Sequence, residues 1–345
     1  MGKKKIVLDL VSDVYIQRED PENAFQYVNH IFKAADVVFG NQEACLSTKG
    51  INRGRFQSNP EMVASLVAGG FDVVGLANNH SMDRGAEGIM ETIETLDKAG
   101  IAHCGAGKNI DEAHKPVIIE RESTNIAFLS YTSVFLDHFQ ALADRAGVAV
   151  VKLRTSYRPP ERFFEVPGMP AIVLTEPEQD SVDRMKQDIA NAKTKADIVV
   201  ISWHWGISQS YRLVAEYQRE MGKLAIDAGA DLIVGHHPHV VQGVEIYKGK
   251  GICYCLGDFS FFLRHTDPRR FHHGSEAVVV ECDIEDKQIQ NISLIPLSKN
   301  ENYEPVVATE EEGEKIFKKM QGLSEAYGTS MEFENGKILV KGVNA

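Results

Sequence analysis

Three histidines fall within four positions of the stretch VGHHPHVVQG, residues 234–243, and they follow the apolar run GADLIV. In an extended segment, His237 and His239 would project to the same side, and Pro238 would stiffen the chain between them. Two imidazoles placed in this way can bind one metal ion or two adjacent ions. We therefore expect His237 and His239 to be ligands and His236 to face into packing. A solvated, histidine-rich turn is the alternative.

Polar side chains that can bind metals also follow four other apolar runs of the chain. They are Asp13, Asn41, Glu43, Asn78, Asn79, His80 and His204. Open α/β sheets bind ligands at the carboxyl edge of their strands, so neighbouring strands would bring these side chains to the histidines. Carboxylates, carboxamides and imidazoles without a thiolate suit Mn²⁺, Zn²⁺ or Fe. The expected cofactor is one or two divalent ions of this kind.

Short apolar runs and helical segments alternate along the chain. Val- and Ile-rich runs, expected to be buried strands, cover residues 5–11, 35–41, 71–78, 126–131, 196–204, 230–237 and 251–260. Segments with helical periodicity cover residues 59–70, 85–100, 181–196 and 214–230. This alternation predicts an α/β layered fold. Residues 274–298 alternate like an antiparallel hairpin, which predicts a mixed sheet in two layers.

One domain is expected over residues 1–300, with residues 301–345 as a C-terminal extension that packs on it. The segment at about 133–170 interrupts the alternation with prolines, arginines and aromatic residues, and we expect an irregular insertion, a candidate lid. The extension begins with a polar, acidic stretch. A short helix and a hairpin-like segment, MEFENGKILVKG, are expected to follow.

Composition limits the classes of protein to consider. The 345 residues are 43% hydrophobic and 25% charged, which is typical of a soluble globular protein, and the net charge of -12 argues against nucleic-acid binding. No apolar run approaches the length of a membrane span, and Asp9 breaks the apolar run after the N-terminal lysines. We expect a cytoplasmic protein, unless an upstream export segment has been removed. Five scattered cysteines predict no disulfide framework. Cys253 and Cys255 could approach a metal, but small buried strand residues are the simpler reading.

The order of the motifs resembles a known family. The segments SD, NQE, NNHSMDRG, HWG, GHHPHVVQ and LGDFSF resemble those of CapA-like proteins, the poly-γ-glutamate capsule synthesis type within the calcineurin-like metallophosphoesterase superfamily. The resemblance covers roughly residues 5–262. It implies an α/β fold in which a two-layer mixed β-sandwich is flanked by helices, four layers in all (α/β/β/α). It also implies a dinuclear metal centre at the strand ends.

The resemblance also implies roles for individual residues. Asp13 and His239 would bind one metal, and Glu43 would bridge two. Asn79, His204 and His237 would bind the second metal. His80 would act near the scissile bond as a general acid or oxyanion stabiliser, and Asp83 would orient it.

Four positions depart from the family pattern. Ser12 stands where the family usually has Gly, and Tyr15 stands where many metallophosphoesterases have a histidine. Asp258 stands where the family often has Asn, and HWG lacks the acidic residue that usually follows it closely. The first metal site is therefore expected to have fewer ligands than usual, and a single metal is an alternative.

Substrate contacts are expected from loops beside the strand ends. Arg53 and Arg55 follow the Glu43 motif, and Asn41 is a third candidate. Further arginines lie in the insertion and in RHTDPRRFHH, residues 264–273. Arginines at such positions could clamp carboxylates or phosphates of a small or polymeric anionic substrate. Ordinary solvated loop charge is the alternative, and the oligomeric state stays open.

Three functions fit this reading. The first is a metal-dependent hydrolase that uses an activated water on a phosphoester, or on an amide of an anionic substrate such as poly-γ-glutamate. The second is a non-hydrolytic enzyme on the same scaffold that abstracts a proton, as an epimerase does. The third is a non-catalytic component of capsule or polyglutamate biosynthesis, because a fold does not fix a reaction.

Overall fold

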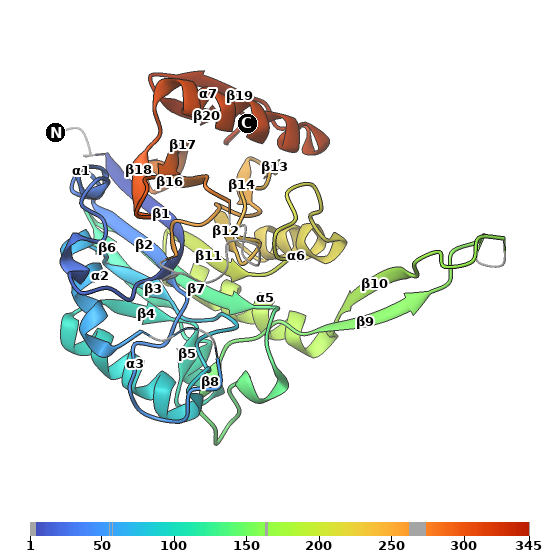
Figure 1. The fold of residues 1–345 in the computed structure, drawn as a ribbon, viewed down its shortest axis with the longest axis horizontal. Helices are drawn as coiled ribbons and strands as arrows, with labels where there is room; N and C mark the ends of the chain where they lie inside the picture. The colour runs from blue at the N-terminus through green and yellow to red at the C-terminus, as the bar shows by residue number, and fades with distance from the viewer. Residues whose placement is uncertain (1–4, 55, 57, 163–164, 262–273, 345) are drawn as a thin grey trace.

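The computed structural model describes residues 5–54, 56, 58–162, 165–261 and 274–344. Two large sheets lie face to face in the middle of the molecule, and helices cover their outer faces (Figure 1). The expected α/β/β/α arrangement of a mixed β-sandwich is confirmed.

The first sheet has 10 strands and is mixed. Its main path, in spatial order, is β19 (Met331–Glu334), β20 (Lys337–Val340), β17 (Gln288–Lys299), β16 (Ala277–Glu285), β1 (Ile6–Tyr15), β2 (Val37–Gln42), β3 (Val73–Gly75) and β4 (Ala102–Cys104). β15 (Ser260–Phe261) pairs with β1, and β18 (Pro305–Val307) pairs with β17. The strands β1 to β4 are parallel, whereas β16, β17, β19 and β20 are antiparallel, as their two hairpin patterns predict.

The second sheet has 6 strands. Its spatial order is β13 (Val244–Tyr247), β14 (Lys250–Cys253), β12 (Leu232–His236), β11 (Ile198–His204), β7 (Thr124–Thr132) and β6 (Val117–Arg121). The neighbours β7, β11, β12 and β14 are parallel, so their carboxyl ends share one edge.

Helices cover the two outer faces because each presents an apolar stripe to its sheet. Side chains of α1 (Asn29–Phe32), α2 (Val63–Gly69) and α3 (Gly85–Ala99) pack with the first sheet. Those of α5 (Gln179–Lys193) and α6 (Glu216–Asp227) pack with the second. Between the sheets, the rings of Phe39 and Phe128 stack with centroids 5.3 Å apart. Burying one such ring contributes about 1.5–3 kcal/mol.

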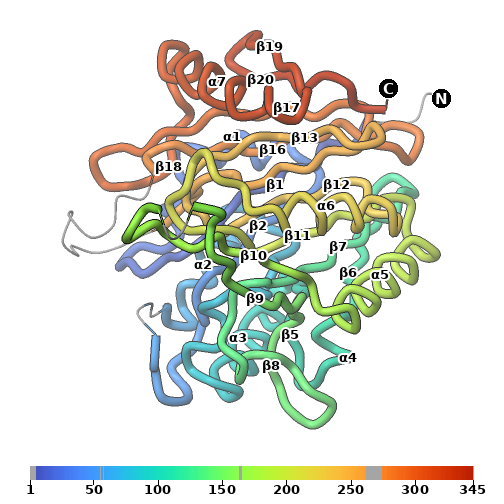
Figure 2. Tube along the Cα trace, turned by 90° about the vertical axis from the view of Figure 1, so that its right-hand side faces the viewer, coloured from blue at the N-terminus to red at the C-terminus, as the bar shows by residue number. Residues whose placement is uncertain are grey.

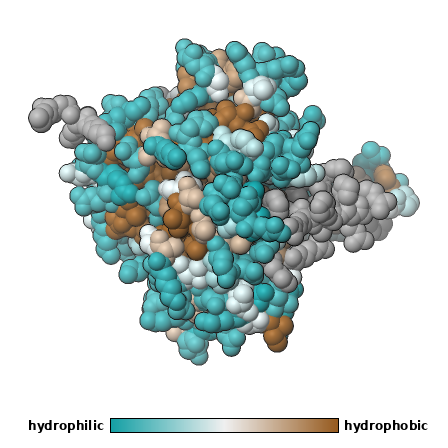
Figure 3. Space-filling view, turned by 60° about the vertical axis from the view of Figure 1, so that its left-hand side comes forward, coloured by the Kyte–Doolittle hydropathy of each residue, from teal (hydrophilic) through white to brown (hydrophobic). Residues whose placement is uncertain are grey.

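Several short elements also occur among the described residues. They are η1 (Pro21–Asn23), η2 (Pro60–Met62), β5 (Ala106–Gly107), α4 (Ile110–Ala113), η3 (Asp137–Phe139), β8 (Gly147–Val148) and η4 (Glu325–Tyr327). The surface matches the charged composition: on the face in Figure 3, polar residues predominate and apolar residues lie in separate small groups. Among the described residues, every helix is too short or too polar to span a bilayer.

The insertion differs from its prediction. β9 (Leu153–Arg158) and β10 (Ile172–Pro177) form an antiparallel two-stranded ribbon that projects from the body (Figures 1 and 2). The expectation of irregular structure over residues 133–170 is wrong for β9, because β-branched and aromatic residues outweigh the nearby prolines. β10 lies beyond the predicted insertion. Tyr157 and Val173 are directly paired across the ribbon and are 72% and 58% exposed.

The C-terminal residues pack on the rest of the fold. β18, β19 and β20 extend the first sheet, and α7 (Glu310–Ser324) contacts both β17 and β13. Ile316 and Met320 of α7 join the core between the sheets. The division of the chain at residue 300 stays a prediction.

Candidate metal centre

Two buried carboxylates of the first sheet meet at its carboxyl edge. Asp13 of β1 pairs in parallel register with Asn41 of β2, and Glu43 follows β2 directly. All three side chains are fully buried. The Asn41 amide nitrogen donates to Asp13 Oδ1 at 2.7 Å and to Glu43 Oε2 at 3.1 Å. Asn41 therefore joins the two acids through hydrogen bonds, and its role as a substrate contact stays a prediction.

The second sheet brings His204 to the same point. His204 ends β11, and its Nδ1 lies 3.8 Å from both Asp13 Oδ1 and Glu43 Oε2. Its Nε2 is 2.7 Å from Asn79 Oδ1, so an Nε2–H donor to this oxygen leaves the Nδ1 lone pair facing the acids. Burial, followed by the nearby His237, lowers the pKa of His204 well below its usual range. The imidazole is thus neutral, which is the form that binds metals.

Asp258 forms a second group with Asp13 and His239. His239 Nδ1 lies 2.6 Å from Asp258 Oδ1 and 3.5 Å from Asp13 Oδ2. Burial acts to lower the pKa of His239, but the charge and hydrogen bond of Asp258 outweigh it and raise that pKa. Asp258 was noted in the sequence only as a departure from the family pattern. Its position near the end of the 251–260 run is the one signal in the sequence, and that signal alone does not pair it with His239.

A buried lysine lies beside this second group. Lys299 Nζ is 3.9 Å from Asp258 Oδ2, and the lysine side chain is only 6% exposed. Burial lowers the pKa of Lys299, against the opposing effect of the Asp258 and Asp13 charges. The ammonium offsets part of the negative charge that these two acids concentrate in the interior.

The histidine turn has a different backbone from the extended one expected. His237 and His239 both have positive φ, 93° and 57°. The expectation that an extended segment aligns them is wrong, because the chain turns through the left-handed region at both residues. Their rings still face one region, with centroids 5.9 Å apart, and the His237 ring lies 4.8 Å from that of His204. The His237 amide also donates to Asp13 Oδ2 at 3.2 Å.

His236 points the other way, into packing, as the sequence predicts. Its Nε2 lies 3.0 Å from Ser202 Oγ and its Nδ1 lies 3.3 Å from Ser12 Oγ. Cys253 and Cys255 are buried free thiols. Among the described residues, neither belongs to a group of side chains spaced to hold a metal.

The arrangement fits a divalent cation. Ligand atoms of Asp13, Glu43 and His204 lie within 4.8 Å of one another, and so do those of Asp13, His239 and Asp258. Asp13 belongs to both groups. Glu43 Oε1 and His237 Nδ1 are buried without a hydrogen-bond partner in the described part of the chain. Burial, and then the Asp13 charge, raise the pKa of Glu43. A cation would satisfy these atoms and offset the clustered negative charge.

A histidine–carboxylate pair stands at the open side of this centre. His80 Nδ1 lies 2.9 Å from Asp83 Oδ2, and the His80 side chain is 18% exposed. Asn78 Oδ1 accepts hydrogen bonds from the backbone of His80 at 3.0 Å and of Ser81 at 2.9 Å, which fixes the turn that carries the pair. The Phe56 ring packs edge-on against the His80 imidazole, 4.2 Å between centroids.

Only some of the arginines expected to contact substrate lie among the described residues. Arg53 is exposed, and its backbone amide donates to Asp83 O at 2.8 Å, so its loop lies beside the histidine–carboxylate pair. Arg55 and the arginines of residues 264–270 lie outside the described residues.

Comparisons with known proteins agree with the motifs. The chain is 33% identical over 264 residues to "PGA biosynthesis protein CapA" of Bacillus subtilis (strain 168), an alignment covering 73% of this chain and 61% of that protein. It is 26% identical over 336 residues to "Capsule biosynthesis protein CapA" of Bacillus anthracis, covering 92% of this chain and 73% of that one. A solved structure, "GAP50 the anchor in the inner membrane complex of Plasmodium", aligns over 93% of this chain and 96% of its own with 11% identity and a TM-score of 0.44. Residues 6–262 match the family model "Bacterial capsule synthesis protein PGA_cap". The chain therefore belongs to the bacterial capsule synthesis protein family PGA_cap.

Proposed function

We propose that this protein is a divalent-metal-dependent hydrolase that acts on an anionic substrate at the carboxyl edge of its two sheets. One observation carries the proposal. Two groups of buried ligands share Asp13, and a partly exposed histidine paired with a carboxylate stands beside them. Structural polar clusters do not need such a histidine at the solvent side, whereas acid–base catalysis does.

Two cation positions follow from the ligand groups. One would be held by Asp13, His239 and Asp258, so that Asp258 supplies a ligand that Tyr15 cannot. The other would be held by Asp13, Glu43 and His204. Asp13 is in both groups, so it would be the ligand that the two positions share. The family resemblance assigns that role to Glu43 instead.

Asn79 and His237 complete the second position. Asn79 Oδ1 is the hydrogen-bond partner of His204 Nε2, and the buried Nδ1 of His237 has no hydrogen-bond partner among the described residues. Mn²⁺, Zn²⁺ and Fe all accept such nitrogen and oxygen ligands.

The chemistry divides between the cations and His80. When bound, a pair of divalent cations lowers the pKa of a water and polarises the bond to be broken. His80 would donate a proton to the leaving group from Nε2, while Asp83 on Nδ1 orients the ring. Asn41 keeps the two acids aligned, and the Phe56 ring limits rotation of the imidazole.

The names of the relatives favour a polyglutamate-related substrate. Two Bacillus relatives carry capsule or PGA biosynthesis in their names. The amide bonds of poly-γ-glutamate would be the bonds cleaved, and exposed Arg53 beside Asp83 is placed to meet a substrate carboxylate. A phosphoester is the other bond that such a centre hydrolyses.

Proton abstraction without cleavage is a second candidate, and one contact favours it. His80 Nε2 lies 3.2 Å from Asn79 Nδ2, so in the resting site this ring nitrogen accepts a hydrogen bond and Nδ1–H faces Asp83. An unprotonated Nε2 at the open side is suited to a general base, as in an epimerase.

Turnover assays on the full chain test the proposal. Protein freed of metal with a chelator should be inactive on γ-linked glutamate oligomers and on an aryl phosphate, and Mn²⁺ or Zn²⁺ should restore cleavage of one of them. His80→Ala should lower kcat by roughly 10²–10⁴-fold with metal content unchanged. Arg184→Ala, a change at an exposed position that pairs with Asp111, is the control.

The other assay results decide between the three candidate functions. Full activity of His80→Ala on the restored substrate contradicts the catalytic role. Solvent deuterium that enters the oligomer without cleavage supports the proton-abstraction candidate. A protein that binds no metal and is inert in both assays is a non-catalytic component of capsule biosynthesis.

A further inference from the structure

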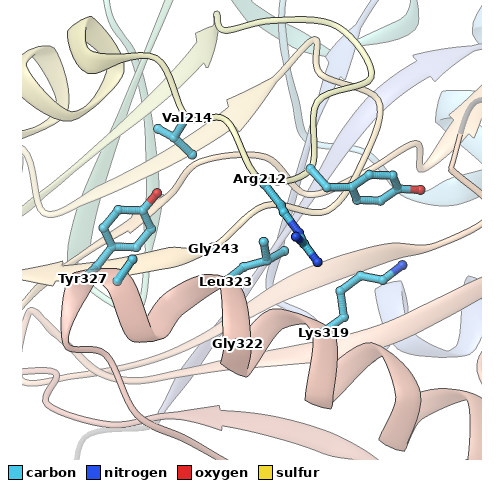
Figure 4. Close-up of a pocket in the computed structure, with 9 residues that line it drawn as sticks. Arg212, Val214, Gly243, Lys319, Gly322, Leu323 and Tyr327 are labelled. Atoms are coloured by element: carbon cyan, nitrogen blue, oxygen red, sulfur yellow. The ribbon is translucent and has the colours of Figure 1, made fainter.

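A pocket of about 670 Å³ opens between the loop after β11 and helix α7. Tyr211, Arg212 and Val214 line it from the loop, and Lys319, Leu323 and Tyr327 line it from the helix and the turn that follows. Figure 4 shows the Arg212 and Lys319 side chains directed into the same opening, with Tyr327 on the opposite side. None of these residues belongs to the metal centre.

Two cationic side chains line the pocket of this acidic protein, and a carboxylate already pairs with one of them, Lys319. Arg212 is exposed, and among the described residues no carboxylate forms an ion pair with it. Lys319 Nζ lies 4.8 Å from the centre of the Tyr211 ring and pairs with Glu276. The whole chain carries a net charge of -12, so a polyanion is attracted only where cations are concentrated locally.

Both walls are anchored to one short segment, so the pocket is preformed. Gln242 is fully buried, and its amide nitrogen donates to Ser210 O at 2.7 Å, which holds the loop wall. On the helix side, the Val244 amide donates to Ser324 Oγ at 3.0 Å. Gly243 between them lets the helix approach closely, because a Cβ there would lie 2.6 Å from Leu323 O.

The same loop contacts the histidine turn of the metal centre. The Gln209 amide donates to Pro238 O at 2.7 Å, and the Gly274 amide donates to His239 O at 3.1 Å. A Cβ on Gly274 would lie 3.6 Å from the Tyr211 hydroxyl, so Tyr211 reaches the residues around that turn. The loop therefore forms a wall of the pocket on one side and supports the metal-binding turn on the other.

We propose that this pocket is a second binding site for a carboxylate-rich polymer, which holds one part of the chain while another part lies at the metal centre. Arg212 and Lys319 would bind carboxylates, and Tyr211, Leu323 and Tyr327 would cover the methylene groups between them. A γ-linked glutamate chain has this alternation of carboxylate and hydrocarbon. Simultaneous use of both sites rests on the proposed function, whereas binding in the pocket does not.

Binding to the metal-free full chain tests the pocket alone. The probe is a fluorescently labelled γ-linked glutamate oligomer of about ten residues, followed by anisotropy at low and at physiological salt. Arg212→Ala should raise the Kd by about 10-fold, the effect of losing one charge-assisted hydrogen bond. Leu323→Glu, which places a negative charge on the helix wall, should weaken binding at least as much, and Arg184→Ala should not change it.

The outcomes separate this proposal from the proposed function. If both pocket variants are folded by circular dichroism and bind the oligomer as the wild type does, the proposal is overturned. If the variants bind weakly but no metal gives turnover, the binding site stands and the hydrolase proposal fails. With turnover, Arg212→Ala should raise KM for the long oligomer and leave kcat on an aryl phosphate unchanged.

Discussion

The buried carboxyl of Asp9 lowers the free energy of unfolding, and the Asp9→Asn substitution should remove this loss of stability. This carboxyl lies in β1 and is 1% exposed, and neither of its oxygens has a hydrogen-bond partner among the described residues. Burial, and then the neighbouring Glu281, raise its pKa from 3.8 to about 8, against the opposing charge of Lys337. Asp9→Asn keeps the shape of the side chain and removes the ionisation.

Proton binding determines how the free energy of unfolding changes with pH. Because the folded pKa is the higher one, between these two pKa values the folded state holds a proton that the unfolded state has lost, so the free energy of unfolding falls as pH rises. The slope is about 1.4 kcal/mol per pH unit, which gives about 3 kcal/mol between pH 5 and pH 7. Asp9→Asn lacks this loss, so its stability relative to the wild type should improve by that amount over the interval.

Urea unfolding at several pH values measures the difference, with the fluorescence of the buried Trp203 and Trp205 as the signal. Asp36→Asn is the matched control, because Asp36 accepts a hydrogen bond from the Val7 amide at 2.9 Å and the amide side chain retains an accepting oxygen. The reasoning is refuted if the stability difference between Asp9→Asn and the wild type stays constant from pH 5 to pH 7.

Three further predictions concern the metal centre. Asp13→Asn should lower the amount of bound metal, measured by plasma mass spectrometry, at both positions. Glu43→Gln should lower it only at the position that includes His204 and spare the one that includes His239 and Asp258. If Glu43→Gln instead lowers both and Asp13→Asn only one, Glu43 is the shared ligand. Asp258→Asn should weaken one metal by roughly 10–100-fold in a competition titration and leave the other unchanged. Gly54→Ala should lower kcat with metal content unchanged, because its Cβ would collide with the Asp83 carboxylate; a normal kcat would show that the loop moves to make room.

Much of the fold could be predicted because it depends on local patterns. Val- and Ile-rich runs separated by amphipathic segments predict layers, and the alternation in residues 274–298 predicts the β16–β17 hairpin. The ribbon of β9 and β10 was missed because prolines and arginines hide its pairing, which depends on two segments separated along the chain. Which strands are neighbours is likewise a long-range property.

The site also has residues that local patterns predict and residues that depend on long-range contacts. Polar residues at strand ends identify Asp13, Glu43 and His204, because parallel strands end at one edge. Asp258 could not be assigned from spacing, because its contact with His239 depends on how the chain returns after β14. The left-handed backbone of His237 was also not predictable, because that conformation is unfavourable for a residue with a Cβ and is imposed by its surroundings.

The position of β1 has a consequence for biosynthesis. β1 ends at Tyr15, but its antiparallel neighbour β16 begins only at Ala277, whereas all strands of the second sheet lie within residues 117–253. On the ribosome, the second sheet can pair while the first still lacks an edge partner for β1. Non-local pairing is slow because a long loop must close first. Until then β1 keeps an unpaired edge, at which the nascent chain can aggregate.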